Sequence, residues 1–67
     1  MPTYLVSDNR GHSKEFNNRV LAHDYASTLM YLDEFESREV WNSLMMGNDC
    51  HVGHETTTVT ILVQGHK

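Results

Sequence analysis

The chain has 67 residues, a net charge of −4 at pH 7, a hydrophobic fraction of 39% and a single cysteine. This length suits one small domain, which we expect to span residues 1–67, and the lone cysteine excludes an internal disulfide scaffold. No apolar run approaches the roughly 18 residues of a membrane-spanning helix, and residues 1–4 lack the charged-then-apolar build of a signal peptide, so we expect a cytoplasmic protein.

The first predicted elements are two strands joined by a turn. Residues 3–7 are rich in residues that favour strands. Residues 8–11 then predict a turn, because Asp and Asn side chains bond their own backbone and Gly tolerates positive φ. Residues 14–23 alternate between apolar and polar positions, with Phe16 and Val20 among the apolar ones. This alternation predicts a half-buried second strand that pairs with the first as a hairpin.

The next predicted element is a helix capped by Asp24, whose carboxylate can accept hydrogen bonds from N–H groups one turn later. Its apolar stripe, at helical spacings of four, three and three, consists of Tyr25, Leu29, Leu32 and Phe35. An unbroken helix would also place Glu36 and Glu39 on this stripe, which is costly. We therefore expect a break or kink near residues 36–37.

A second helix is expected after the break, with Ser37 as its N-cap. Its apolar side consists of Val40, Trp41, Leu44 and Met45. Gly47 suits the position just after the helix end, where a left-handed backbone is common. Residues 47–55 are polar and are expected to form a loop.

The last predicted strand, residues 56–64, is the clearest, because Val59, Ile61 and Val63 recur at every second position. The predicted fold class is α+β, strand–strand–helix–helix–strand, with a three-stranded antiparallel sheet and the helices packed on one face. A right-handed crossover would place the last strand beside the first, in the order 2-1-3. The last strand would then be a sheet edge, able to pair with a second copy of the chain. The residues predicted to line this dimer edge are Thr58, Thr60 and Leu62.

Charge is unevenly distributed, because residues 23–55 carry seven carboxylates and, among Lys and Arg, only Arg38. An acidic helical face steers and orients a basic partner, and Trp and Tyr are over-represented among interface hot spots. The candidate partner-binding residues are Tyr31, Asp33, Glu34, Glu36, Glu39 and Trp41. The alternative is a solvated helix face in which Arg38 pairs locally with Glu34, with Trp41 in the core.

Five histidines are many for a chain of this length, so a zinc site is one hypothesis. Its candidate ligands are Cys50, His51 and His54, with a fourth from His12, His23, His66 or a carboxylate. Adjacent Cys and His side chains rarely point at one tetrahedral centre, and the chain has no Cys-x-x-Cys pair. The alternative is a polar loop with a small buried cysteine, and we expect no bound cofactor.

The predicted hairpin is mildly basic and contains Arg10, His12, Lys14 and Arg19. Nucleic-acid binding normally requires an excess of Lys and Arg on one face, whereas this chain has five against nine Asp and Glu. Direct nucleic-acid binding is therefore not expected. The sequence contains no phosphate-cradling glycine loop and no recognisable nucleophile–base pair, so we also predict that the protein is not an enzyme.

By elimination, we predict a non-catalytic binding module that occludes the working surface of another protein, which itself has a basic or nucleic-acid-binding surface. In size and element order the chain is similar to small bacteriophage proteins that bind and block host enzymes, such as RNA polymerase inhibitors and anti-CRISPR proteins. This similarity is one of layout and includes no shared motif. It implies an accessory or inhibitory role. A zinc-binding module and a nucleic-acid-binding regulator are the alternatives.

Overall fold

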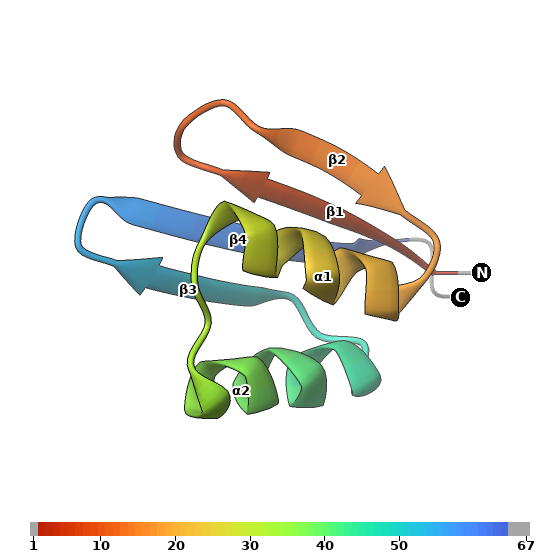
Figure 1. Ribbon diagram of the computed structural model, residues 1–67. Helices are drawn as coiled ribbons and strands as arrows, with labels where there is room; N and C mark the ends of the chain where they lie inside the picture. Colours follow the sequence, from red (N-terminus) through yellow and green to blue (C-terminus); the bar gives the residue numbers. More distant parts are fainter. Residues whose placement is uncertain (1, 65–67) are drawn as a thin grey trace.

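A computed structural model describes residues 2–64, which form one antiparallel sheet covered on one face by two helices (Figure 1). The elements, in chain order, are β1 (Thr3–Asp8), β2 (Ser13–Phe16), α1 (Arg19–Leu29), α2 (Glu34–Met45), β3 (Cys50–His54) and β4 (Thr57–Gln64). The strand order is β2-β1-β4-β3. The α+β class is confirmed, but the sheet has four strands where the sequence predicted three.

β4 lies in the middle of the sheet, between β1 and β3. The prediction that the last strand lies beside the first is therefore confirmed, and the prediction that it is a sheet edge is wrong. The predicted loop over residues 47–55 contains β3, which returns to β4 through the two-residue turn at Glu55 and Thr56. Glu55 takes a positive φ of 50° in this turn. The predicted dimer edge is thus covered by a neighbouring strand on each side; its residues are Thr58, Thr60 and Leu62.

α1 begins at Arg19, inside the segment that was expected to continue the second strand. Asn18 is its N-cap, because the Asn18 side-chain oxygen accepts hydrogen bonds from the N–H groups of Val20 (2.7 Å) and Leu21 (3.3 Å). The predicted cap at Asp24 is therefore wrong, and β2 ends at Phe16. An apolar alternation over so few residues is also compatible with the first turn of an amphipathic helix.

α2 begins earlier than expected, because Asp33 and not Ser37 is its N-cap. The Asp33 carboxylate accepts from the Glu36 N–H (2.8 Å), and the Glu36 carboxylate accepts from the Asp33 N–H (3.2 Å). This reciprocal pair is a capping box. The break between the helices therefore falls at residues 30–33, and Phe35 lies on α2 with 70% of its surface exposed, outside the core.

The predicted end of the second helix at Gly47 is confirmed. Gly47 has a φ of 75°, in the left-handed region that glycine tolerates best. The Asn48 N–H donates to the Ser43 carbonyl (2.9 Å) and the Gly47 N–H to the Leu44 carbonyl (3.1 Å). This pattern satisfies two of the last free carbonyls of the helix, and it turns the chain towards β3.

The core lies between the sheet and the helices, and it consists of Tyr4, Val6, Ala22, Ala26, Met30, Val40, Leu44, Val59, Ile61 and Val63. α1 contributes mainly two alanines, whose small side chains let the helix lie close to the sheet. α2 contributes Val40 and Leu44, each 1% exposed. Deleting a fully buried leucine side chain costs about 2–5 kcal/mol, so Leu44 is one of the main residues that attach α2 to the sheet.

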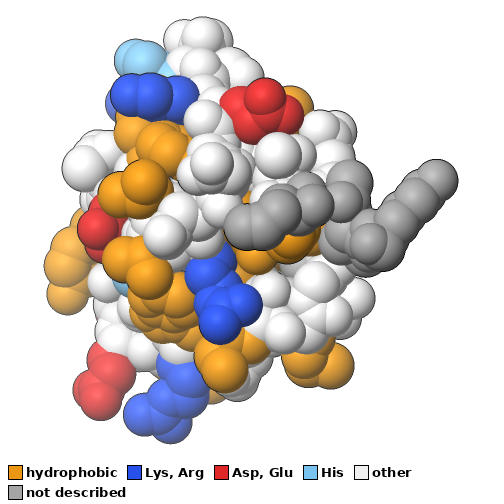
Figure 2. All heavy atoms as spheres, turned by 90° about the vertical axis from the view of Figure 1, so that its right-hand side faces the viewer, with side chains coloured by type: hydrophobic (Ala, Val, Ile, Leu, Met, Phe, Trp, Pro, Cys, Tyr) orange, Lys and Arg blue, Asp and Glu red, His pale blue; other side chains and the backbone are white. Residues whose placement is uncertain are grey.

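The end of the helical layer where α1 begins and α2 ends is partly apolar at its surface. Figure 2 looks onto the end where α1 begins and α2 ends, and it shows hydrophobic side chains gathered on the helical side with Lys and Arg side chains among them. The exposed large side chains of these two helix ends are Val20, Leu21, Met45 and Met46, between 49% and 74% exposed. The predicted apolar position Met45 therefore faces solvent.

Candidate protein-binding groove

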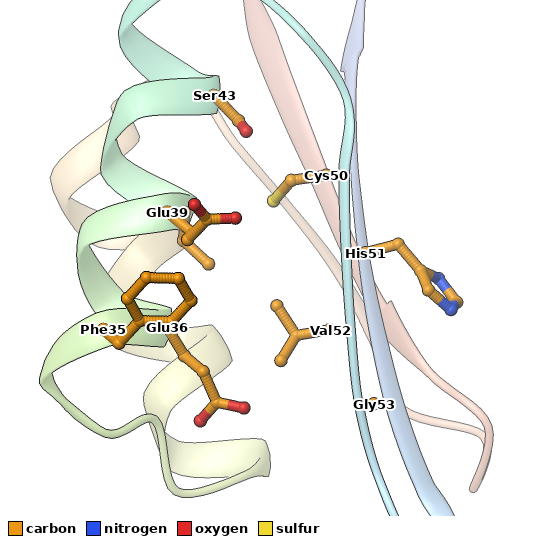
Figure 3. Close-up of a pocket in the computed structure, with 9 residues that line it drawn as sticks. Phe35, Glu36, Glu39, Ser43, Cys50, His51, Val52 and Gly53 are labelled. Atoms are coloured by element: carbon orange, nitrogen blue, oxygen red, sulfur yellow. The ribbon is translucent and has the colours of Figure 1, made fainter.

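A groove with a cavity volume of about 320 Å³ separates α2 from the edge strand β3 (Figure 3). α2 contributes Phe35, Glu36, Glu39, Val40 and Ser43, and β3 contributes Cys50 and Val52 among others. The groove is open to solvent. Val40, Cys50 and Val52 form the apolar part of its lining, and Glu36 and Glu39 form the acidic part.

Two carboxylates of α2 line this groove but have different surroundings. Glu36 is only 19% exposed, because one of its oxygens completes the capping box and the other bonds the His54 ring nitrogen Nε2. Glu39 is exposed, and its carboxylate points into the groove on the side of Cys50 (Figure 3). Within residues 2–64, Glu39 makes no hydrogen bond or ion pair. Glu36 thus stabilises the fold, whereas Glu39 is available to a partner.

Of the other predicted partner-binding residues, some are exposed to solvent and some make contacts within the fold. Tyr31 is 77% exposed in the loop between the helices. The Glu34 side chain is 92% exposed and lies 3.8 Å from Arg38, the local ion pair expected from their spacing of four. Such an exposed pair contributes at most a few tenths of a kcal/mol. Asp33 is exposed, but its carboxylate caps α2.

Trp41 is half-buried and joins the two helices. Its ring stacks on the ring of His23 in α1, with centroids 4.5 Å apart and an interplanar angle of 18°. The His23 Nε2 atom lies 2.8 Å from the Ser37 hydroxyl oxygen, so a hydrogen bond adds to this contact. No local pattern predicts that His23 and Ser37 are partners, because they lie on different helices.

The same cluster brings a serine, a histidine and a carboxylate together without the geometry of a catalytic triad. The His23 Nδ1 atom lies 3.9 Å from the Asp24 carboxylate, which is too long for a hydrogen bond. Asp24 therefore does not orient the imidazole as the acid of a triad does. The stack on Trp41 explains the position of His23 as helix packing.

The candidate zinc ligands do not converge. Cys50 points into the groove, whereas His51 points away from it and lies 3.0 Å from the Thr60 hydroxyl on the opposite face of the sheet (Figure 3). His54 is bonded to Glu36. Among residues 2–64 no group of three or more His, Cys, Asp or Glu could hold a metal ion. His66, a predicted fourth ligand, lies outside the described residues.

Cys50 is also poorly disposed to act as a ligand or a nucleophile. Burial raises the pKa of its thiol to about 11, and the negative charge of Asp49 adds to the effect. The thiol is therefore protonated at neutral pH, whereas the thiolate is the form that binds metals and attacks electrophiles.

The basic groups of the first hairpin serve internal contacts. Arg10 donates a hydrogen bond to the Leu29 carbonyl (2.8 Å), which ties the turn to the end of α1. The Lys14 ammonium lies over the rings of Phe16 (5.6 Å) and Tyr25 (5.9 Å), within cation–π range. These contacts attach the hairpin to α1 and give both side chains a role in packing.

Asp8 organises the turn of this hairpin. Its carboxylate, 0% exposed, accepts hydrogen bonds from the backbone N–H groups of Arg10 (3.0 Å) and His12 (2.8 Å) and contacts the His12 ring. Burial raises the pKa of this carboxyl, but the hydrogen bonds and the charge of His12 prevail, so the pKa is below its ordinary value. Together with Gly11 at a φ of 98°, these contacts confirm the turn predicted over residues 8–11.

No protein-family model, curated protein or solved structure matches this chain. None of the helices within residues 2–64 is long and apolar enough to cross a membrane.

Proposed function

We propose that this protein is a non-catalytic, cytoplasmic binding module that contacts a protein partner through the outer face of α2 and the groove beside it. The observation that supports this most directly is the state of Glu39. Its carboxylate faces an open groove and is bonded to no residue within 2–64, so a basic partner group could pair with it without breaking an internal contact. Complementary charge pairs across an interface orient a partner and contribute to its specificity.

Exposed aromatic side chains extend this surface at the start of α2. Tyr31 and Phe35 are 77% and 70% exposed, and both lie close in sequence to Glu34. Large aromatic side chains surrounded by polar ones are typical of interface hot spots. The binding surface we propose, the α2 face, consists of Tyr31, Glu34, Phe35 and Glu39. Asp33, Glu36 and Trp41 support it from within the fold.

We propose that the protein acts by covering the working surface of its partner. A standard interface covers about 800 Å² on each partner, and this chain has a surface of 4441 Å² over its described residues. One face is therefore large enough for an interface of standard size. An accessory or inhibitory protein that covers an enzyme's basic working surface is the form we favour, with phage-type inhibitors of host enzymes, including anti-CRISPR proteins, as its sharpest version.

The test is a capture experiment with matched charge reversals. The tagged protein, Glu39→Lys and Glu15→Lys are each incubated with nuclease-treated lysate of the native cells. Glu15 is exposed on β2, at the opposite edge of the sheet, so its reversal changes the net charge equally. We expect a stoichiometric partner protein with the native chain and with Glu15→Lys, and its loss with Glu39→Lys. Equal capture by both variants, or no partner, would contradict the proposal.

A further inference from the structure

We propose that the partner is held as an extended segment carrying lysine or arginine, which pairs with β3 as a fifth strand and lays a basic side chain in the groove beside Glu39. This inference rests on the proposed binding function and specifies the form of the partner. It combines three features of residues 2–64: a strand edge that pairs with no other strand of this range, a groove on the same side, and a carboxylate in that groove that none of these residues bonds.

The backbone of β3 offers free hydrogen-bonding groups. The Thr58 N–H donates to the Asn9 side chain (3.1 Å) and the Thr58 carbonyl accepts from the Asn9 N–H (3.1 Å), so the Thr58 backbone faces the β1 side. Gly53 is opposite Thr58 in the register of β3 and β4. Because bonded and non-bonded pairs alternate in antiparallel ladders, the polar groups of Gly53, and of His51 two residues earlier, point to the outer edge. No strand within residues 2–64 pairs with that edge.

β3 also lacks the features that usually protect an edge strand. Its five residues include neither lysine nor proline, the residues that most often block edge pairing. At Gly53 an added Cβ would lie 3.7 Å from the Thr58 hydroxyl, an ordinary contact, so the strand is not crowded there. β2, the other edge, is shorter and carries Lys14. β3 is therefore the more receptive of the two edges.

The groove determines which side chains the added strand would present. A new strand would lie about 4.8 Å beyond β3, with alternate side chains directed towards α2. Those side chains would enter the space lined by Cys50, Val52 and Glu39. Lysine and arginine fit this space, because their aliphatic stems can cover the apolar floor while their charged ends reach the carboxylate.

Charge argues against a second copy of this chain as the occupant. The chain has a net charge of −4, and β3 contains no Lys or Arg and is bordered by Asp49 and Glu55. Pairing two β3 strands would bring these acidic borders and the two Glu39 side chains towards one another. A basic segment of another protein has the complementary charge.

The test uses a labelled library of eight-residue peptides in which lysine occupies alternate positions and the intervening residues vary. Binding is measured by fluorescence anisotropy with the native protein, Gly53→Pro and Gly53→Ala. Proline removes the outward N–H of Gly53 and breaks no bond to β4, as edge positions allow. Alanine keeps that N–H and serves as the matched control. Circular dichroism verifies that both variants fold.

We expect the native protein and Gly53→Ala to bind the same lysine peptides, and Gly53→Pro to bind them at least about tenfold more weakly, a change of about 1.4 kcal/mol. A second measurement leaves the protein unchanged: methylating one alternate set of peptide amides should abolish binding, and methylating the other set should not. Replacing the lysines by glutamate should also abolish it.

Several results would overturn the inference. These are the absence of any bound lysine peptide, equal binding by Gly53→Pro, equal effects of both methylation patterns, and a homodimer in sedimentation that Gly53→Pro dissociates. The proposed function is judged separately, by capture of a full-length partner. A partner whose capture depends on Glu39 but not on Gly53 would leave the binding module standing and refute strand addition alone.

Discussion

Two glutamates three residues apart on α2 should differ in how much the same substitution lowers the stability of the fold. Glu36→Ala should destabilise the fold and Glu39→Ala should not, because only Glu36 has partners within the described chain. The substitution at Glu36 removes one half of the capping box and the bond to His54. The substitution at Glu39 removes an exposed carboxylate that faces the groove.

The magnitude follows from these contacts. A lost capping interaction costs about 1 kcal/mol. A hydrogen bond to a charged group is worth about 1.5 kcal/mol or more when buried, but His54 is 40% exposed, so we expect roughly half of that. Glu36→Ala should therefore lower the free energy of unfolding by about 1.5–2 kcal/mol. In a domain of this size that corresponds to a fall in Tm of about 6–16 °C.

Urea and thermal unfolding, followed by circular dichroism and by Trp41 fluorescence, measure both effects. We expect Glu39→Ala to stay within about 0.5 kcal/mol of the native protein. Glu36→Gln should fall between the two, because glutamine can complete a capping box but carries no charge for His54. Equal unfolding free energies for Glu36→Ala and Glu39→Ala would refute the distinction between the structural and the available carboxylate.

Three further outcomes are expected. Leu44→Ala should lower the free energy of unfolding by about 2–5 kcal/mol, whereas Met45→Ala, at a residue 64% exposed, should change it little in the same urea titration. Iodoacetamide at pH 8 should alkylate Cys50 at least about tenfold more slowly in the folded protein than in urea, because the raised pKa of about 11 reduces the thiolate fraction; equal rates would contradict this. The lowered pKa of Asp8 adds stability that is fully present above the unfolded pKa near 3.8 and is lost as pH falls through the lower folded pKa. Between pH 5 and pH 2, the free energy of unfolding should therefore fall more for the native protein than for Asp8→Asn.

The errors in the predicted fold came from places where local signals were ambiguous. The segment before Ala22 fits both a strand and an amphipathic helix, and the cap at Asn18 decides for the helix. The polarity of residues 47–55 predicts a loop where β3 lies, and Cys50–His54 contains only one β-branched residue, so its intrinsic strand preference is weak. Its strand conformation depends on pairing with β4 across a tight turn. A segment with a weak intrinsic strand preference can still form a strand when the tertiary fold places it beside a strong one.

The candidate site, too, was predictable only where its features depend on neighbouring residues. Its acidic character and its place on a helix were evident from the residues between positions 33 and 39. The distinct roles of Glu36 and Glu39 were not, because they depend on His54, eighteen residues further along the chain. The helix contact of Trp41 with His23 was missed for the same reason, since stacking of two rings depends on how the helices lie against each other.

The sequence by itself determined the α+β class, the strong strand β4, the turn at residues 8–11 and the end of the second helix at Gly47. The strand, the turn and the helix end each depend on side chains and backbone within a few residues, so local chemistry suffices. The α+β class follows from the order of such elements along the chain. Only the tertiary structure decided that β4 lies inside the sheet, that β3 forms its edge, and that a groove opens between β3 and α2. These features arise from contacts between distant segments, whose free energy no local pattern contains.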